Sequence, residues 1–429
     1  GRIDEKEGRH EEEESVSDKE ESLSTMCQRA QELFEVAQDY DGAEVLYKRV
    51  LALDPNHVDT LCNYALLIEF TQDEHADQKT AAAELEHAEA LYRHAAFLEP
   101  NRTDVLYQHA LFLKNVRGDY DGAEQLMLRV LELDPLDATA MCNYALLLHH
   151  VRKDAPAAQR IYQRALALPN HTLSDEESVS LLYSYASLCQ TSLNDAEQAN
   201  ELFRAALALA PSDATVLNSM ASLQHLHFND TAQAEQLYQR ALECEPENVE
   251  VMSNYALLLQ HLKRHAQAYK LLRRAVKTAP DHPDTVCNLA QFEHKKRRRF
   301  ARARTLYRNV LKLDRQHLRA LVNFGVLEGK QFANVTKAQR LFERALDVDP
   351  DSRDAKEGYM HCKSILSGAL IHDQDDANFD RFVYSASNTS PPQEGALDGT
   401  GSLSPIGQAE VGTLAQTAER DSRGASQGE

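Results

Sequence analysis

The heptapeptide NYALLIE at residues 63–69 returns almost unchanged as NYALLLH at 143–149 and NYALLLQ at 254–260. Around the first copy, apolar residues follow one another at i, i+3, i+4 and i+7, as Leu61, Tyr64, Ala65 and Ile68. This spacing is typical of a helix with one buried face. Because the phrase occurs three times, we interpret the chain as a set of internal repeats.

A second phrase alternates with the first and closes at a proline. It reads AEVLYKRVLALDP up to Pro55 and AEQLYQRALECEP up to Pro246, again with helical spacing. Its nine versions end near residues 55, 100, 135, 170, 211, 246, 280, 315 and 350, mostly 34 or 35 residues apart. Each repeat therefore predicts two helices joined by a turn. A single hairpin cannot bury its apolar stripe, so consecutive hairpins have to stack.

The spacing of small, aromatic and proline residues resembles that of the tetratricopeptide repeat. That family has a small residue at position 8, Ala at 20 and 27, an aromatic residue at 24 and Pro at 32. Position 8 is occupied here by Ala65, Ala110, Ala145, Ala186, Ala221, Ala256, Ala290 and Gly325. The resemblance covers residues 24–350. It implies an all-α fold, a right-handed α-solenoid of about nine helix hairpins, followed by a capping helix over residues 351–372.

Three repeats depart from the pattern. The first has Gln31 at its small position and is expected to act as a terminal cap. An insertion around residues 71–84 is expected to lengthen both helices of the second repeat. The stretch HTLSDEESVS, residues 171–180, is expected to open the fifth repeat as a longer loop.

The two ends of the chain differ in composition from the repeats. Residues 1–23 are expected to form an acidic disordered tail, and residues 373–429 a disordered tail rich in Ser, Gly and Pro. The seven cysteines are scattered without a C-x-x-C pair, which indicates reduced thiols and a cytoplasmic localisation, with a nuclear one as the alternative. No apolar run approaches the ~18 residues of a membrane span, so no membrane partner is expected.

We find no motif that predicts catalysis. Nucleotide loops, nucleophile elbows and zinc-spaced Cys/His sets are absent from the sequence, so we expect no enzyme, no cofactor and no metal. Several histidines recur near the end of successive first helices: His149, His150, His225, His261 and His294. Neighbouring helix axes lie ~8–10 Å apart, too far for a ready zinc site, so we interpret these histidines as groove-lining or solvated.

Position 6 of the first helix is predicted to face a concave groove and carries an amide in most repeats. The candidate peptide-binding residues are Asn63, Gln108, Asn143, Asn254, Asn288 and Asn323, with Ser184 and Ser219 in the remaining repeats. An amide offers a carbonyl acceptor and two N–H donors, which match the backbone of an extended peptide. A similar asparagine file lines the repeats of O-linked N-acetylglucosamine transferase. The alternative is that Asn at this position is a common structural feature of such repeats.

One cationic run, EHKKRRRFARAR at residues 293–304, interrupts a chain of formal charge −21. Residues 261–345 hold 21 Lys and Arg against 6 Asp and Glu, whereas residues 25–260 hold 15 against 36. The candidate basic patch comprises Lys295, Lys296, Arg297, Arg298, Arg299, Arg302 and Arg304. Three interpretations stay open: a solvated helix edge, a site for an acidic protein or an import receptor, and a nucleic-acid site. The charge asymmetry would also favour head-to-tail self-association.

These observations predict a non-catalytic scaffold that binds partner proteins or peptides in its groove. Acidic residues such as Asp59 and Asp284 at position 2 argue against the chaperone-tail clamp of this family, because they would repel an acidic tail. Two alternatives remain. One is a nuclear RNA-processing scaffold that uses the basic repeats 7–9, and the other is the substrate-selecting arm of a larger enzyme similar to O-linked N-acetylglucosamine transferase.

Overall fold

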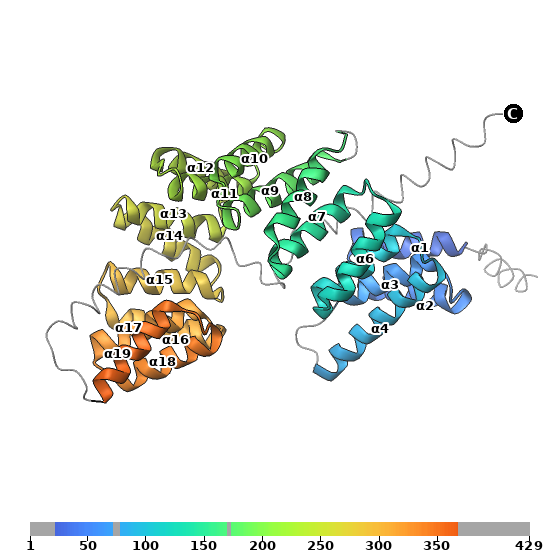
Figure 1. Ribbon diagram of the computed structural model, residues 1–429. Helices are drawn as coiled ribbons and strands as arrows, with labels where there is room; N and C mark the ends of the chain where they lie inside the picture. The colour runs from blue at the N-terminus through green and yellow to red at the C-terminus, as the bar shows by residue number, and fades with distance from the viewer. Residues whose placement is uncertain (1–21, 72–77, 170–172, 368–429) are drawn as a thin grey trace, which may run out of the picture. The chain divides into compact units, whose positions relative to one another are not determined.

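The computed structural model describes residues 22–71, 78–169 and 173–367, and within these ranges every regular element is a helix (Figure 1). Nine pairs of helices follow one another and a further helix closes the described part of the chain. The predicted all-α solenoid is therefore confirmed. The described residues divide into two compact units, an N-terminal unit up to Leu173 and a C-terminal unit from Ser174.

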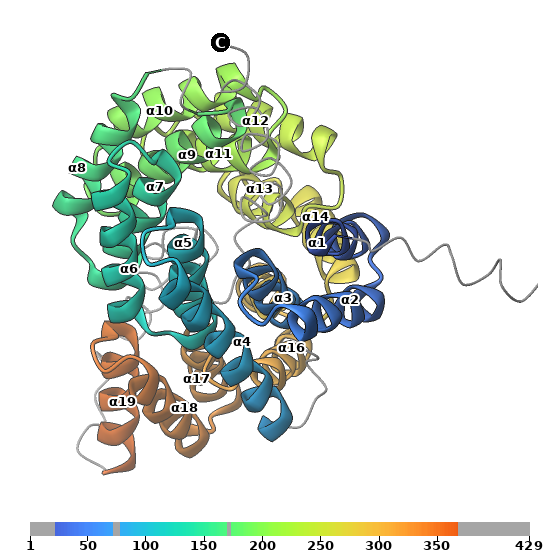
Figure 2. The same cartoon turned by 90° about the vertical axis from the view of Figure 1, so that its right-hand side faces the viewer.

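The N-terminal unit contains four hairpins, which follow one another in sequence order (Figure 2). Three of its first helices continue into a short π-helical segment, labelled η. The bounds are α1 Leu23–Glu32, η1 Leu33–Ala37, α2 Tyr40–Leu53, α3 Val58–Phe70, α4 Gln78–Leu98, α5 Thr103–Phe112, η2 Leu113–Arg117, α6 Tyr120–Leu133, α7 Ala138–Leu147, η3 Leu148–Arg152 and α8 Ala155–Leu166.

The C-terminal unit contains five hairpins and the last helix, stacked in sequence order (Figure 1). The bounds are α9 Asp175–Thr191, α10 Ala196–Leu209, α11 Ala214–Leu226, α12 Thr231–Cys244, α13 Val249–His261, α14 His265–Thr278, α15 Pro283–Lys295, α16 Phe300–Leu313, α17 Leu318–Phe332, α18 Val335–Val348 and α19 Arg353–Leu366. The predicted capping helix is α19.

The core of each hairpin lies where its two helices approach closely. In the seventh repeat, Ala256 of α13 and Ala268 of α14 are both fully buried. In the ninth repeat, Gly325 takes the place of the first alanine. A Cβ atom at this position would lie 2.9 Å from the ring of Phe342, so the close approach of α17 and α18 requires glycine.

Successive hairpins of the C-terminal unit contact one another through their first helices. Helix α11 packs against α13, α13 against α15, and α15 against α17, while α14 and α16 pack between consecutive first helices. The first helices therefore form one continuous layer. We call the surface of α11, α13, α15 and α17 that points away from the second helices the inner face.

The repeat length of 35 has a local explanation. Eight turns between first and second helices contain one residue with a left-handed φ of 49–66°: Gln38, Gly118, Lys153, Asn194, Asn229, Lys263, Arg298 and Ala333. The backbone N–H of the next residue or two then bonds to a carbonyl at the end of the first helix, as Arg299 does with Glu293 at 2.9 Å. The extra residue thus ends the first helix.

Two expectations for the N-terminal unit were wrong. The small position of the first repeat is held by the fully buried Ala30, whereas Gln31 bonds to Glu35 on the exposed side of the helix. Because the turn contains one extra residue, Gln38, the small position of the first helix lies one residue earlier than the repeat spacing predicted. In the second repeat, α4 is lengthened to 21 residues but α3 has 13, like an ordinary first helix, so the insertion extends one helix and not both.

The expected loop over residues 171–180 was also wrong in its second half. Helix α9 begins at Asp175, because Ser174 and Glu177 form a capping box in which each side chain accepts a hydrogen bond from the other residue's backbone N–H. The predicted disordered tails, residues 1–23 and 373–429, lie outside the described residues except for residues 22–23.

Candidate functional site

Two of the six amides at position 6 form a clear hydrogen bond to the preceding repeat. Asn254 donates to Asn218 Oδ1 at 3.2 Å, joining α13 to α11, and Asn143 donates to the Tyr107 hydroxyl at 2.7 Å, joining α7 to α5. The acceptor is position 5 of the preceding first helix in both cases. Since Asn143 is 9% exposed and Asn254 is 7% exposed, these two candidate residues act as links between repeats.

Asn63 and Asn323 are also engaged within the chain. Asn63 lies 3.9 Å from the Cys27 sulfur, again at position 5 of the preceding repeat, and Asn323 donates to the Arg319 carbonyl of its own helix at 2.8 Å. Both side chains remain partly exposed.

The junction between α13 and α15 lacks this link. Ser253 occupies position 5 of α13 and Asn288 occupies position 6 of α15, the positions through which Asn254 and Asn143 bond to the preceding repeat. The Ser253 hydroxyl and the Asn288 carbonyl oxygen are both buried and have no hydrogen-bond partner among the described residues. A buried polar atom without a partner costs about 1–3 kcal/mol and calls for an explanation. We call this pair the α13–α15 amide site.

The amide oxygen of Gln108, on α5 of the N-terminal unit, is the corresponding case there. It too is buried without a hydrogen-bond partner among the described residues. The predicted amides are therefore of three kinds: those that join repeats, Asn323, which bonds within its own helix, and those whose oxygen has no partner among the described residues.

The end of α15 carries a histidine, whose ring lies against Phe300 and Tyr307 of α16, and a lysine, both with shifted pKa values. Burial, with the nearby Lys295 and Lys330, lowers the pKa of His294 to about 4. Burial also lowers the pKa of Lys295 to about 8. On α11 and α13, His225 Nε2 and His261 Nδ1 lie 3.1 Å apart, and burial lowers the pKa of His225 to about 4. His294 and His225 are therefore neutral at physiological pH.

The basic run does not form one surface. Arg304 binds Glu328 through two hydrogen bonds of 2.7 and 2.8 Å, and Lys337 adds a third of 2.7 Å. Glu328 is 0% exposed. Burial alone would raise its pKa, but these bonds hold the pKa of Glu328 below its usual value. Arg304 is therefore a structural residue that joins α16 to α17.

Two further arginines of the run serve a second buried carboxylate. Arg302 Nε lies 3.3 Å and Arg297 Nη1 lies 3.9 Å from Glu293 Oε1, and Glu293 is 0% exposed. Three exposed cations of the run form no ion pair with a described residue and lie in the turn between α15 and α16: Lys296, Arg298 and Arg299. The predicted patch is thus divided between buried ion pairs, the inner face at Lys295 and this exposed turn.

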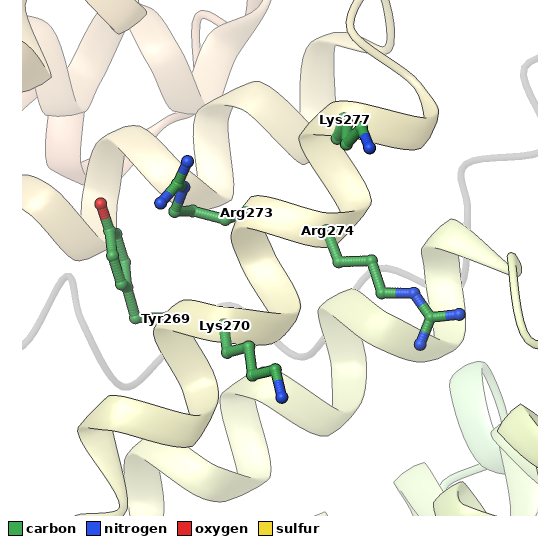
Figure 3. Close-up of a pocket in the computed structure, with 5 residues that line it drawn as sticks. All are labelled: Tyr269, Lys270, Arg273, Arg274 and Lys277. Carbon is green, nitrogen blue, oxygen red and sulfur yellow. The ribbon is translucent and has the colours of Figure 1, made fainter.

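An exposed cationic depression lies on α14, one helix before the run. Tyr269, Lys270, Arg273, Arg274 and Lys277 line it (Figure 3). The sequence analysis missed these residues because they are spaced along one helix face and do not form a contiguous run.

The family follows from these repeats and from sequence comparison. Two models described as tetratricopeptide repeat match residues 116–172 and 225–285. The chain is a tetratricopeptide-repeat protein. Such repeats generally bind protein partners and are generally non-catalytic.

Solved structures with similar helix arrangements have low sequence identity to this tetratricopeptide-repeat protein. A monomeric mutant of IFIT1 with m7Gppp-AAAA is 12% identical with a TM-score of 0.51, and the match covers 80% of each chain. A tetratricopeptide repeat protein from Parabacteroides merdae is 18% identical with a TM-score of 0.49, covering 60% of this chain and 97% of that one. At such identity the first match concerns the fold alone. A search of curated protein sequences finds no match.

A tyrosine–glutamate bond joins several repeats of this tetratricopeptide-repeat protein and was missed from the sequence. The Tyr255 hydroxyl donates to Glu235 at 2.7 Å, and the equivalent pairs are Tyr64 with Glu44 at 3.0 Å and Tyr144 with Glu124 at 3.4 Å. The tyrosine belongs to the repeated NYALL phrase and the glutamate to the AE that opens the other phrase. Because both phrases recur nearly unchanged, their tyrosine and glutamate could have been predicted to form a contact between repeats.

Arginines of the second helices form another link between repeats. Arg240 donates to the Pro211 carbonyl at 3.0 Å, and the same bond joins Arg164 to Pro135, Arg274 to Pro246 and Arg344 to the Arg315 carbonyl. Each arginine thus holds the loop that precedes its own repeat.

Two negative findings apply to the described ranges. Residues 22–71, 78–169 and 173–367 contain no group of three or more His, Cys, Asp or Glu side chains that could hold a metal ion. None of the helices formed by the same residues is both long and apolar enough to cross a bilayer.

Proposed function

We propose that this protein is a non-catalytic scaffold that binds an extended segment of a partner protein along the inner face of its C-terminal unit. The α13–α15 amide site is the proposed point of recognition. The observation that carries the proposal is the pair of unpartnered atoms on Ser253 and Asn288, since the equivalent side chains at the preceding junction, Asn218 and Asn254, bond to each other.

A peptide backbone has the groups that this site lacks. Its N–H groups donate and its carbonyls accept, so one extended residue can bond both to the Asn288 amide and to the Ser253 hydroxyl. Asn288 is partly exposed, and rotation of its amide brings the oxygen toward the inner face. Each bond contributes about 0.5–1.5 kcal/mol to binding.

The surroundings add apolar and charged contacts. Leu257, one turn beyond Ser253 on α13, is partly exposed on the same face. Lys295, two turns beyond Asn288 on α15, offers an ammonium group. The proposed ligand is therefore an extended segment with an apolar side chain near Leu257 and an acidic side chain near Lys295.

The proposal changes the roles within the predicted amide file. Asn143 and Asn254 have a structural role, because their side chains are nearly buried and already bonded. Asn288 is the residue that we assign to recognition. The RNA-processing role, the enzyme-arm role and the cytoplasmic localisation stay predictions.

Peptide selection followed by a binding assay tests the proposal. Peptides are selected from a displayed random library on the full chain, and their affinity is measured by fluorescence anisotropy for the Ser253→Ala/Asn288→Ala variant. Losing two hydrogen bonds should weaken binding about tenfold. The variant should be no less stable than the parent, because the removed atoms have no partner.

The matched control is Asn143→Ala, which removes the same side chain from the same repeat position in the N-terminal unit. It should lose stability but keep its peptide affinity. Equal affinity of the parent and the Ser253→Ala/Asn288→Ala variant for every selected peptide would remove this site from the account.

A further inference from the structure

A second surface of the C-terminal unit carries exposed cations without partners. Helix α14 contains no acidic residue, and Lys270, Arg273, Arg274 and Lys277 are all exposed (Figure 3). Arg274 donates to the Pro246 carbonyl. Among the described residues, no carboxylate forms an ion pair with the other three. This differs from Arg264 at the start of the same helix, which binds Glu235 at 2.6 Å.

Tyr269 connects this helix to the basic run. Its ring stacks on Phe292 with centroids 5.8 Å apart, and the Arg297 guanidinium lies 4.0 Å from the ring centroid. Arg273 approaches the same ring at 5.9 Å. The cations of α14 and those of the turn after α15 therefore belong to one region. We call Lys270, Arg273, Lys277, Lys296, Arg298 and Arg299 the outer cationic face.

Helix α16, which follows Arg299, lacks the side-chain cap that most other second helices have among the described residues. The second helices α2, α6, α8, α10 and α12 each begin after an aspartate whose side chain accepts a backbone N–H, as Asp195 and Asp230 do. Arg299 occupies this N-cap position in α16, as Arg264 does in α14, and neither side chain forms a cap. A cation here also opposes the helix dipole. A residue that disagrees with its local structure in this way is expected at a functional surface.

The outer cationic face fits an anionic ligand that has no bases to stack. Nucleic-acid sites for single strands need aromatic rings that are free to receive bases. Tyr269 already has Phe292 and Arg297 as ring neighbours, and Phe300 packs on the apolar core around Tyr307. An acidic polypeptide needs only the cations.

The chain itself contains such a polypeptide. Residues 1–21 hold ten acidic and four basic side chains, including the run EEEE at 11–14 and two further glutamates at 20 and 21. They precede the N-cap of α1 at Ser22. We propose that this N-terminal acidic segment binds the outer cationic face of α14 and the α15–α16 turn. Any acidic partner protein then has to displace it to reach this surface.

Zero-length cross-linking tests the contact in the full chain. Carbodiimide joins a carboxylate to a lysine amine only when the two are in contact, and mass spectrometry identifies the pair. We expect cross-links from Glu11–Glu14 to Lys270 or Lys277. Mixing isotopically heavy and light chains shows whether the segment binds its own copy or a second one. Cross-links from these glutamates only to lysines outside the outer cationic face would overturn the proposal.

A binding assay with charge variants gives an independent test. A labelled peptide of residues 1–21 is titrated with the full chain and with two variants of it. The α14 variant is Lys270→Glu/Arg273→Glu/Lys277→Glu. The control variant reverses three exposed cations on other second helices, Arg49→Glu/Arg160→Glu/Arg204→Glu. Both variants change the net charge equally. We expect affinity to fall about tenfold or more for the α14 variant and about twofold for the control.

Single-stranded oligouridine RNA is the competing ligand. If the α14 variant loses affinity for this RNA but binds the peptide as tightly as the parent does, the surface recognises nucleic acid and the proposal is wrong. Equal loss of peptide affinity in both variants would show that net charge alone is responsible, which also contradicts it.

Discussion

Replacing Arg299 by aspartate should stabilise the C-terminal unit. Arg299 is the N-cap residue of α16, with φ −90° and ψ 68°. Asp230 caps α12 from nearly the same conformation, φ −85° and ψ 83°, and accepts a hydrogen bond from the Gln233 N–H at 2.9 Å. Aspartate at position 299 would therefore accept the Arg302 N–H without a change of backbone.

The expected gain has two parts. A side-chain cap contributes about 1 kcal/mol. Replacing a cation by an anion at the positive end of a helix adds about 0.3–1 kcal/mol. No ion pair with a described residue is lost in exchange, because Arg299 is exposed and forms none. The free energy of unfolding should rise by about 1.5 kcal/mol, which corresponds to about 3–6 °C in melting temperature for a unit of this size.

Urea unfolding followed by far-ultraviolet circular dichroism measures this gain. Two variants separate its parts: Arg299→Ala removes the cation without adding a cap, and Asp230→Arg imposes the Arg299 situation on α12. The first should gain less than Arg299→Asp, and the second should lose about 1.5 kcal/mol. If Arg299→Asp is no more stable than Arg299→Ala, the assignment of Arg299 to a missing cap is refuted.

Arg304→Ala should destabilise the protein by about 3 kcal/mol, because it leaves the buried carboxylate of Glu328 with one cation, Lys337. The control Arg298→Ala should change stability by less than about 0.5 kcal/mol. Equal losses of unfolding free energy in urea would contradict the division of the basic run into buried and exposed residues. Burial lowers the pKa of His294 to about 4, so below pH ~6.5 the unfolded state binds a proton that the folded state does not bind. The contribution of neutral His294 to the free energy of unfolding is therefore complete above pH ~6.5 and is lost as the pH falls from ~6.5 to ~4. His294→Gln should make the decrease in unfolding free energy between pH 7 and pH 5 smaller by about 1–2 kcal/mol, and an unchanged pH profile would count against it. Arg240→Ala should cost about 1 kcal/mol through the lost bond to the Pro211 carbonyl, and hydrogen exchange should show faster opening of the loop before α11; unaltered exchange there would contradict this role.

The fold could be predicted because its main requirement is periodic. Small residues at positions 8 and 20 and an apolar stripe at helical spacing are enough to define a stacked hairpin, and these recur through the chain. The errors came from local geometry. The residue with left-handed φ that ends a first helix is rarely glycine here, so the sequence did not show that the turn at Gln38 contains an extra residue. Counting back from the second helix without that residue placed Gln31 at the small position, whereas Ala30 is the buried residue. Conversely, Ser174 and Glu177 have the spacing of a capping box, which marks the start of a helix, and this pattern was overlooked.

The candidate site was less predictable, because it depends on which side chains of adjacent repeats face each other. Asn254 and Asn288 occupy the same repeat position and cannot be distinguished by type. Their difference lies in the residue across the junction, Asn218 in one case and Ser253 in the other. The basic run shows the same limit, since the buried Glu293 and Glu328 that bind its arginines look like ordinary surface residues in the sequence.

Photo-crosslinking from the inner face tests the proposed function most directly. A benzoylphenylalanine in place of Leu257, beside the α13–α15 amide site, is compared with the same residue in place of Arg204 on the outer surface of α10, using a peptide selected on the full chain. We expect covalent capture of the peptide from position 257 and none from position 204, with capture abolished by excess unlabelled peptide. Capture from position 204 but not from position 257 would contradict the proposed function.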